Sequence, residues 1–142
     1  MNPPIKVTEE FFVADRNDIS DLAGQGFRTM INNRPDGEAA DQPSHEEMRA
    51  EAERLGLEYR YIPVKTETIT VADVEAQAKA VRDCPQPVVA HCRSGTRSYL
   101  LWAADRVLNG GEDPERLVAN AAERGIDLRS LPALVAHLQV SR

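Results

Sequence analysis

Apolar and polar residues follow one another along this chain in two patterns, one typical of strands and the other of helices. Short apolar runs predict strands at 11–14, 27–32, 57–64 and 88–90. Apolar residues three or four positions apart predict helices between and after these strands. The apolar faces of these helices are Ile19, Leu22 and Ala23; Met48, Ala52 and Leu55; Val71, Val74, Ala78 and Val81; and Leu101, Ala104 and Leu108. A last helix is predicted near 130–138.

Capping residues mark where most of these helices begin. Asn17, Ser44 and Thr70 each precede a helical pattern, and Ser44 opens a Ser-x-x-Glu capping box. Asp113 is followed by Pro114, which is favoured at the first position of a helix, and this pair predicts a further helix.

The order of these segments indicates the fold class. Strands that alternate with helices predict an α/β protein with a mostly parallel central sheet and helices on both faces. No repeat or low-complexity tract interrupts the chain, so we expect one domain over residues 1–142. In such sheets ligands bind beyond the carboxyl ends of the strands. The segments that begin at Arg34 and at Cys92 both follow predicted strands and are expected at that edge.

Composition narrows the range of functions. With 28% charged residues and a net charge of -6, the chain is not expected to bind nucleic acid or an anionic membrane. No apolar run is long enough to span a bilayer, and the first residues lack a signal-peptide pattern, so a cytoplasmic location is expected. Two cysteines are too few for a disulfide framework, the three histidines lack metal-ligand spacing, and no cofactor motif is present.

The segment 88–98 carries the clearest chemical signal. A buried-strand pattern ends at a cysteine, a tight loop runs from Cys92 to Arg97, and a helical pattern follows at once. This order places the Cys92 thiol among backbone N–H groups at the positive end of a helix, which favours the thiolate. Cys92 is therefore the candidate nucleophile, and Arg97 is the candidate group that binds an anion with its planar guanidinium.

The other residues of the loop are expected to shape it or to contact substrate. Gly95 allows a backbone conformation that turns amides inward, and Ser98 is placed to donate a hydrogen bond to the sulfur of Cys92. The side chains of Arg93, Ser94 and Thr96 contact substrate in one interpretation and are capping or solvated groups in the other.

Four residues outside the loop are weaker candidates. Arg34 and Asp36 follow the strand at 27–32 and are expected at the rim of the site, unless they form a solvated turn. His91 is expected to brace the loop rather than to act as a base. Cys84 is expected to be a half-buried bystander, with a role as a resolving thiol as the alternative.

These residues resemble known families. The run Cys92 to Arg97 resembles the active-site loop of rhodaneses, whereas the segments 19–32, 61–64 and 87–92 resemble the scaffold of dual-specificity protein tyrosine phosphatases. The combination, together with the phrase at 31–38, is similar to a bacterial family, the phosphatase-like domain of beta-lactamase-hydrolase-like proteins, whose members are also named sulfurtransferases. The resemblance covers roughly residues 5 to 135.

The chain departs from the phosphatase pattern in two places. Phosphatases place five residues between cysteine and arginine, and here there are four. They also carry a general-acid aspartate about thirty residues before the cysteine, where this chain has 64–68 without an aspartate. Glu67 and Asp36 are the two possible acids. General acid help matters for an ester oxygen that must leave, and matters little for sulfite or a thiolate.

Three functions remain open. The favoured one is a sulfurtransferase in which Cys92 becomes a persulfide, with a small anionic sulfur donor, a thiol acceptor and sulfur-oxidising enzymes as expected partners. The second is a phosphatase that forms a phosphocysteine. The third is a sensing module without turnover, in which oxidation joins Cys84 and Cys92.

Overall fold

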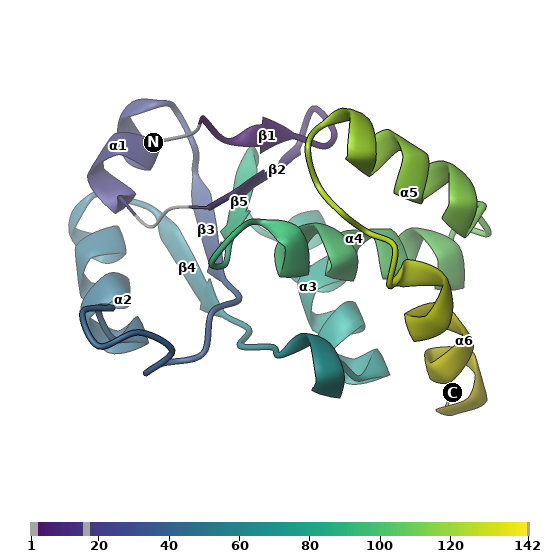
Figure 1. Cartoon of the computed structure of the whole chain (residues 1–142). Helices are drawn as coiled ribbons and strands as arrows, with labels where there is room; N and C mark the ends of the chain where they lie inside the picture. The colour runs from purple at the N-terminus through teal and green to yellow at the C-terminus, as the bar shows by residue number, and fades with distance from the viewer. Residues whose placement is uncertain (1–2, 16–17, 142) are drawn as a thin grey trace.

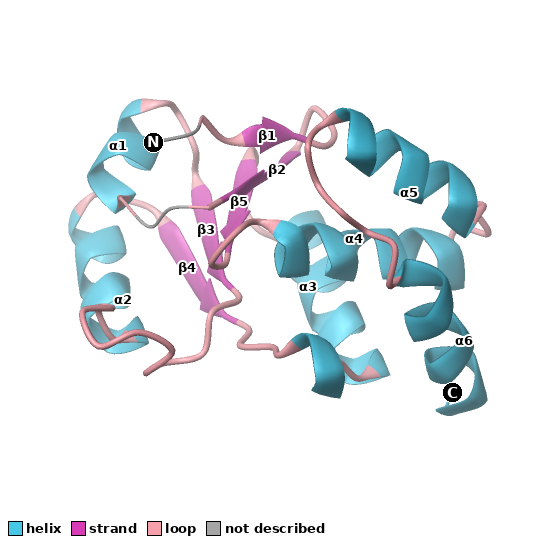
Figure 2. Cartoon of the chain, in the orientation of Figure 1, coloured by secondary structure: helices cyan, strands magenta, loops and turns pink. Residues whose placement is uncertain are grey.

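Within the described residues, 3–15 and 18–141, the computed structural model has a five-stranded sheet of order β1-β2-β5-β3-β4 (Figures 1 and 2). β2, β5, β3 and β4 run parallel, and β1 pairs antiparallel with β2. The strands are β1 (Ile5–Lys6), β2 (Phe11–Ala14), β3 (Thr29–Asn32), β4 (Glu58–Tyr61) and β5 (Val88–His91). The helices are α1 (Ile19–Gly24), α2 (His45–Arg54), α3 (Val71–Asp83), α4 (Thr96–Leu108), α5 (Pro114–Glu123) and α6 (Leu131–Ser141), with a 3-10 turn η1 (Thr66–Thr68).

Helices cover both faces of the sheet, as the sequence predicts. α1 and α2 lie on one side in Figure 1, and α3 to α6 lie on the other. The two hydrophobic cores follow the alternation of the strands: Val88 and Ala90 of β5 belong to the core under α3 to α6, and Val89 between them belongs to the core under α1 and α2. The mostly parallel α/β architecture expected from the sequence is confirmed.

Local sequence signals explain where most helices begin. Ser44 and Glu47 form the capping box of α2, and Thr70 forms one with Asp73 at the start of α3. Asp113 caps α5, whose first residue is a proline. The cap predicted for the first helix, Asn17, lies outside the described residues. The N-cap of α1 is Asp18, whose carboxylate accepts a hydrogen bond from the amide of Asp21, so the prediction was wrong at this position.

Two strands are shorter than predicted. The run at 57–64 forms a strand only over β4. Beyond it, Ile62 and Val64 still donate their amides to the carbonyls of Asn32 and Asn33, but Pro63 between them has no amide proton to donate. The run at 27–32 forms a strand from Thr29 onward. β1 and η1 were not predicted, since two or three residues are too short to show a period.

β5 is the central strand, and this position determines where the site lies. In the sheet register His91 is paired with Ala14 of β2 and with Asn32 of β3. The next residues of the three strands, Asp15, Cys92 and Asn33, therefore leave the sheet side by side at its carboxyl edge. This is the edge at which parallel sheets bind ligands.

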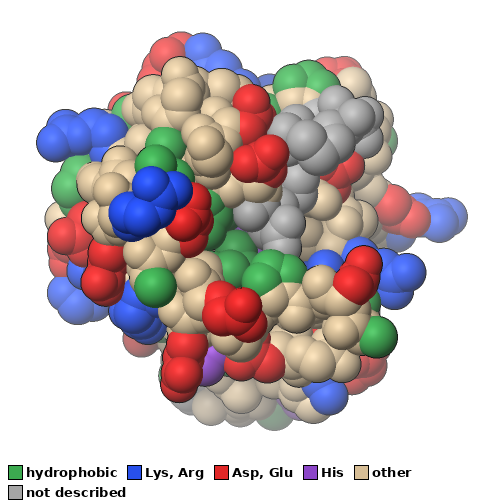
Figure 3. All heavy atoms as spheres, turned by 90° about the vertical axis from the view of Figure 1, so that its left-hand side faces the viewer, with side chains coloured by type: hydrophobic (Ala, Val, Ile, Leu, Met, Phe, Trp, Pro, Cys, Tyr) green, Lys and Arg blue, Asp and Glu red, His purple; other side chains and the backbone are tan. Residues whose placement is uncertain are grey.

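Charged side chains on one face of the protein are distributed rather than concentrated. On the face formed by α1 and α2, Asp and Glu side chains are spread across the surface with Lys and Arg side chains among them (Figure 3). An anion is therefore attracted to the site by local arginines and not by a broad basic surface on this face. Among the described residues, no helix has both the length and the apolar character required to cross a membrane.

Candidate active site

Cys92 lies at the centre of the carboxyl edge and is almost completely buried. Its side chain is 2% exposed, and its amide donates to the carbonyl of Ala14 at 3.4 Å. On the other side, the amide of Asn33 donates to the carbonyl of His91 at 2.9 Å. The thiol therefore begins a loop that is held between the ends of β2 and β3.

The loop turns its backbone toward the sulfur. The amide of Gly95 donates to Sγ of Cys92 at 3.1 Å. Gly95 has φ of +88°, the left-handed conformation that favours glycine, and it is the N-cap residue of α4. A Cβ atom here would meet its nearest neighbours, in Val13 and Ala14, at 3.7 Å, an ordinary contact. Conformation rather than space is therefore the reason for a glycine at this position.

Further amides of the loop are available to an anion. Within the described part of the chain, the amides of Arg93, Ser94, Arg97 and Ser98 have no hydrogen-bond acceptor. The first turn of a helix leaves such N–H groups unpaired, and they bear a partial positive charge. Together with the Gly95 amide they form a cradle for an oxyanion next to the thiol.

Arg97 is held beside this cradle by two partners. Its terminal nitrogens donate to both carboxylate oxygens of Glu38, at 2.7 and 2.8 Å, and to the carbonyl of Val64 at 2.9 Å. The hydrogen bond with Glu38 is the main cause that raises the pKa of Arg97, and the negative charge of the Cys92 thiolate raises it further. The guanidinium therefore lies close to the sulfur, in the position expected of a group that binds substrate.

Glu38 also binds the second candidate arginine. Nε of Arg34 donates to the same carboxylate at 3.2 Å. The hydrogen bond from Arg97 lowers the pKa of Glu38, with Arg34 adding to the effect. Glu38 is thus ionised, and its single negative charge faces the two guanidinium groups that it binds. The structure brings Arg34 to the rim, where the sequence places it.

Ser98 does not have the predicted contact. Its hydroxyl donates to Oδ1 of Asn33 at 2.7 Å, and its side chain is fully buried. A hydroxyl has a single proton, so it cannot also donate to the sulfur of Cys92. The prediction of Ser98 as a donor to Cys92 was therefore wrong, and contact of Ser98 with substrate stays a prediction.

The other hydroxyls of the loop bind one another. Ser94 donates to the hydroxyl of Thr96 at 3.0 Å, and the amide of Thr96 donates back to Ser94 at 3.3 Å. These contacts join the loop to the first residue of α4. The Arg93 side chain is exposed. Substrate contact by Arg93, Ser94 and Thr96 stays a prediction.

Asp36 binds the first residue of α2. Its carboxylate accepts from the amide of His45 at 2.8 Å and contacts Nδ1 of His45 at 2.5 Å, at the start of α2. The His45 ring stacks on Tyr61, whose hydroxyl accepts from the amide of Asp36. The hydrogen bond with His45 lowers the pKa of Asp36. A general acid must hold a proton, so Asp36 is wrong as a candidate acid.

Glu67 is the remaining acid candidate. It lies exposed on η1, three residues after Val64, whose carbonyl binds Arg97. The segment that carries Glu67 therefore adjoins the site, and a role as acid stays a prediction.

His91 is buried at the end of β5. Burial, with the positive charges of Arg34 and Arg97, lowers the pKa of His91 to about 3, so the ring is neutral and is no base partner for the thiol.

Cys84 is the C-cap residue of α3 and comes before β5 in the chain. It lies near the start of β3, as shown by the neighbouring Pro85, whose carbonyl accepts a hydrogen bond from the Thr29 hydroxyl. β5 thus separates it from Cys92 by roughly 10 to 13 Å. Since a disulfide needs Cα atoms within about 7 Å, the Cys84–Cys92 disulfide is not compatible with this fold.

Sequence reasoning missed three functional partners, namely Glu38, Asn33 and Gln77. Gln77 carried a detectable signal, because it falls on the apolar face of α3, three residues after Val74 and four before Val81. A polar residue in such a stripe indicates a buried hydrogen bond. Glu38 and Asn33 gave no comparable signal, because their partners are distant in sequence.

The fold and the cysteine loop define a protein with the architecture of protein tyrosine phosphatases. Residues 5–109 match the family described as "Beta-lactamase hydrolase-like protein, phosphatase-like domain". The chain belongs to this family. The Beta-lactamase hydrolase-like protein of Xylella fastidiosa (strain Temecula1 / ATCC 700964) is 37% identical over 112 residues, which are 79% of this chain and 26% of that protein. The chain thus spans about a quarter of the length of that relative.

Solved structures agree. A protein of Neisseria meningitidis described as a "putative phosphatase" has a TM-score of 0.83 and 28% identity, with 94% of this chain and 96% of that chain covered. Tk-PTP in its active form has a TM-score of 0.71 and 16% identity, with 94% and 93% covered, and shows the fold alone. The expected family and phosphatase-like scaffold are confirmed. These findings support a cysteine-based, phosphatase-like function better than the sulfurtransferase function that the sequence favoured.

Proposed function

We propose that this domain is a cysteine-dependent phosphatase that acts on phosphate monoesters. The observation that carries the proposal is that Cys92, Arg97 and the loop amides without an acceptor among the described residues lie together after the end of β5. Such a site offers a nucleophile on one side of a tetrahedral anion and hydrogen-bond donors to its oxygens. Membership of a phosphatase-like family supports the same reaction.

The reaction has two steps. The Cys92 thiolate attacks phosphorus, an S–P bond forms, and the P–O bond to the leaving group breaks. The loop amides and Arg97 hold the three non-bridging oxygens while this occurs. Water then attacks the phosphocysteine, the S–P bond breaks, and inorganic phosphate and the thiolate are released. Arg97 suits both steps because Glu38 and Val64 fix its guanidinium in advance.

The leaving oxygen needs a proton in the first step. Asp36 is excluded by its contact with His45, and Glu38 is held as a carboxylate by two arginines. We therefore assign this proton to Glu67 on η1 or, for acidic phenols, to water. Aryl phosphates, whose leaving groups are stable as anions, are the substrates expected to react fastest.

The test is hydrolysis of p-nitrophenyl phosphate by the purified protein. We expect turnover that is abolished in Cys92→Ser and in Arg97→Ala, and a covalent intermediate heavier by one phosphoryl group after acid quench of the wild-type protein. Absence of both turnover and intermediate with a folded protein would exclude the proposal.

Sulfur transfer is the second candidate, and the spacing of the loop favours it. Four residues separate Cys92 from Arg97, one fewer than in phosphatases, which makes the cradle smaller. In this reaction the thiolate attacks the outer sulfur of thiosulfate, the S–S bond breaks, and sulfite leaves with the electron pair. An acceptor thiolate then removes the outer sulfur of the Cys92 persulfide. A gain of one sulfur atom by the protein, with thiocyanate formed from cyanide, would place this reaction first.

A further inference from the structure

Three buried polar side chains beneath the loop form a closed ring of hydrogen bonds. Ser98 donates to Oδ1 of Asn33 at 2.7 Å, Nδ2 of Asn33 donates to Oε1 of Gln77 at 2.8 Å, and Nε2 of Gln77 donates to the carbonyl of Ser98 at 3.0 Å. Each of the three side chains is at most 1% exposed. We call this set, Asn33, Gln77 and Ser98, the Asn33 ring.

The Asn33 ring joins elements that are distant in sequence. Asn33 follows β3, Gln77 lies in the middle of α3, and Ser98 is the third residue of α4. The Nδ2 group of Asn33 also donates to the carbonyl of Ile62, just after β4, at 2.9 Å. The first turn of α4 is therefore tied by side-chain contacts to the ends of two strands and to a neighbouring helix.

The energetic balance of the ring makes its geometry specific. A buried amide or hydroxyl without a partner destabilises the folded protein, so each member of the ring depends on the other two. Small shifts of α4 along its axis would break two of the three bonds at once. Apolar side chains could fill the same volume, but they would not fix the helix to within a fraction of an ångström.

The position of Ser98 connects the ring to the thiol. Ser98 follows Arg97 directly, and the amides of both residues belong to the cradle around Cys92. The ring also fixes the direction of the Ser98 hydroxyl, because this hydroxyl donates its hydrogen bond to Asn33. The Ser98 hydroxyl therefore does not donate to the sulfur, which accepts a hydrogen bond from the Gly95 amide.

We propose that Asn33 and Gln77 are positioning residues that act through Ser98 to hold the first turn of α4 against Cys92 and so set the reactivity of the thiol. Both candidate reactions use the Cys92 thiolate, so the inference rests only on its role as nucleophile. It extends the site beyond the loop, to a helix on one face of the sheet.

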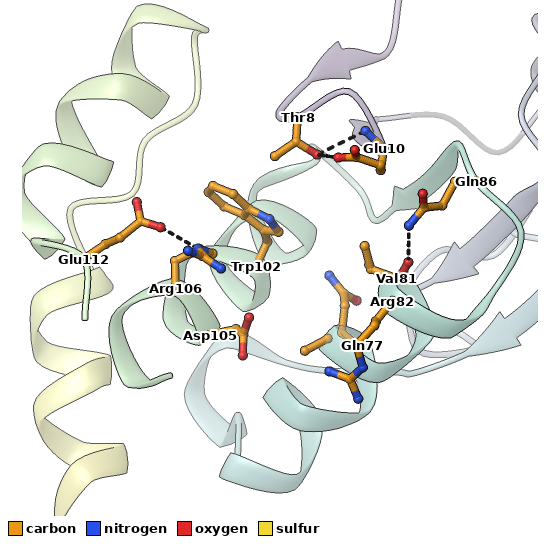
Figure 4. Close-up of a pocket in the computed structure, with 11 residues that line it drawn as sticks. Thr8, Glu10, Gln77, Val81, Arg82, Gln86, Trp102, Asp105, Arg106 and Glu112 are labelled. Carbon is orange, nitrogen blue, oxygen red and sulfur yellow. Dashed lines mark hydrogen bonds and ion pairs between the residues drawn. The ribbon is translucent and has the colours of Figure 1, made fainter. Parts of the chain in front are cut away.

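Gln77 also lines a cavity, and another glutamine of this cavity supplies a control variant. The cavity, of about 620 Å³, lies between α3 and α4, and Trp102 and Asp105 also line it (Figure 4). Gln86 lines the same cavity and, like Gln77, donates to a backbone carbonyl, that of Val81, at 3.1 Å (Figure 4). Gln86→Leu is a control for Gln77→Leu, because it removes a glutamine of the same cavity and its hydrogen bond to a backbone carbonyl, at an exposed position, without touching the Asn33 ring.

The experiment measures alkylation of Cys92 by iodoacetamide as a function of pH, with the modified peptide identified by mass so that Cys84 does not interfere. In Gln77→Leu we expect alkylation at neutral pH to be about tenfold slower, the equivalent of one hydrogen bond to the thiolate, and its pH midpoint to move upward. Gln86→Leu should match the wild type. A folded Gln77→Leu with the wild-type profile would overturn the inference.

A second pair keeps the inference testable if Gln77→Leu does not fold. Ser98→Ala removes a single oxygen and should show the slower alkylation, whereas Ser98→Thr keeps the hydroxyl and should restore most of the rate. Equal profiles for Ser98→Ala and the wild type would overturn the inference. Because alkylation needs no turnover, this result is independent of whether the protein hydrolyses phosphate esters.

Discussion

The Arg97 guanidinium and the Glu38 carboxylate, 59 residues apart in sequence, form a two-point ion pair at 2.7 and 2.8 Å beside the buried thiol of Cys92. Both side chains are largely shielded, with 13% and 23% of their surface exposed. The pair holds the guanidinium plane at a fixed angle, which a single contact would not do. Positioning of Arg97 is therefore the main role of Glu38.

Replacement of Glu38 by glutamine tests this role. Glu38→Gln keeps the shape of the side chain but loses one acceptor and the charge, so Arg97 is held less firmly, by the Val64 carbonyl and one remaining acceptor. We expect kcat/KM for p-nitrophenyl phosphate to fall by about 10- to 100-fold. Glu51→Gln is the matched control, because Glu51 forms an exposed ion pair with Arg54 at 2.7 Å, remote from the loop. Equal activity of Glu38→Gln and the control would contradict the assignment.

The same pair predicts a change of stability at acid pH. Arg97 and Arg34 lower the pKa of Glu38 in the folded protein from its usual 4.5. The unfolded chain therefore takes up this proton first, and the stability that the pair contributes is fully present above pH 4.5 and is lost as the pH falls through the folded pKa. Urea unfolding at several pH values below 5 should show a weaker pH dependence in Glu38→Gln than in the wild type. A parallel dependence in the two proteins would exclude Glu38 as the source.

The sequence predicts the frame of the site but not its cross-links. The thiol, the left-handed glycine and the arginine follow one another within a strand–loop–helix unit, and such local order is visible in the chain. By contrast, Ser98 binds Asn33 across 65 residues, and Asn33 binds Gln77 across 44. Periodicity indicates which face of a helix is buried, but it does not indicate which buried polar groups meet. The role of Ser98 was wrongly predicted for this reason.

Asp36 shows a related limit. Its position after a strand is correct for a residue at the rim, but the Pro35–Gly37 turn carries it to the start of α2, where a helix N-terminus and His45 both attract a carboxylate. A sequence pattern locates such a residue along the chain without giving the direction of its side chain.

His91 provides a second prediction about pH. Burial lowers its pKa to about 3, while the ring takes a proton below pH 6.5 once the chain unfolds. The unfolded state then binds one proton more than the folded state, so the free energy of unfolding falls as the pH decreases from 6.5 toward 3, by up to about 1.4 kcal/mol per pH unit. Between pH 6.5 and 5 this slope should be smaller in His91→Gln. Equal slopes in the two proteins would show that the imidazole is charged in the folded state.

Gly95 predicts a separation of stability from reactivity. Gly95→Ala places a side chain at φ of +88°, which costs about 1–2 kcal/mol, although the space around it is sufficient. Gly56→Ala is a matched control, since Gly56 has φ of +82° after α2, with open space around it. Both variants should lose similar stability in urea unfolding, but only Gly95→Ala should slow the alkylation of Cys92, because the Gly95 amide then turns from the sulfur. Equal alkylation rates in the two variants would contradict the contact between the Gly95 amide and the sulfur of Cys92.

The remaining acid candidate is tested by the dependence of rate on the leaving group. If Glu67 donates the proton, the wild-type protein should hydrolyse aryl phosphates with acidic and with weakly acidic phenols at similar rates. In Glu67→Gln the rate should then fall by about 100-fold for weakly acidic phenols and little for p-nitrophenol, because only the former need the proton. Asp36→Asn should behave as the wild type, since its carboxylate is held by His45. A strong dependence on the phenol already present in the wild type, and unchanged in Glu67→Gln, would remove Glu67 from the mechanism and leave water as the source of the proton.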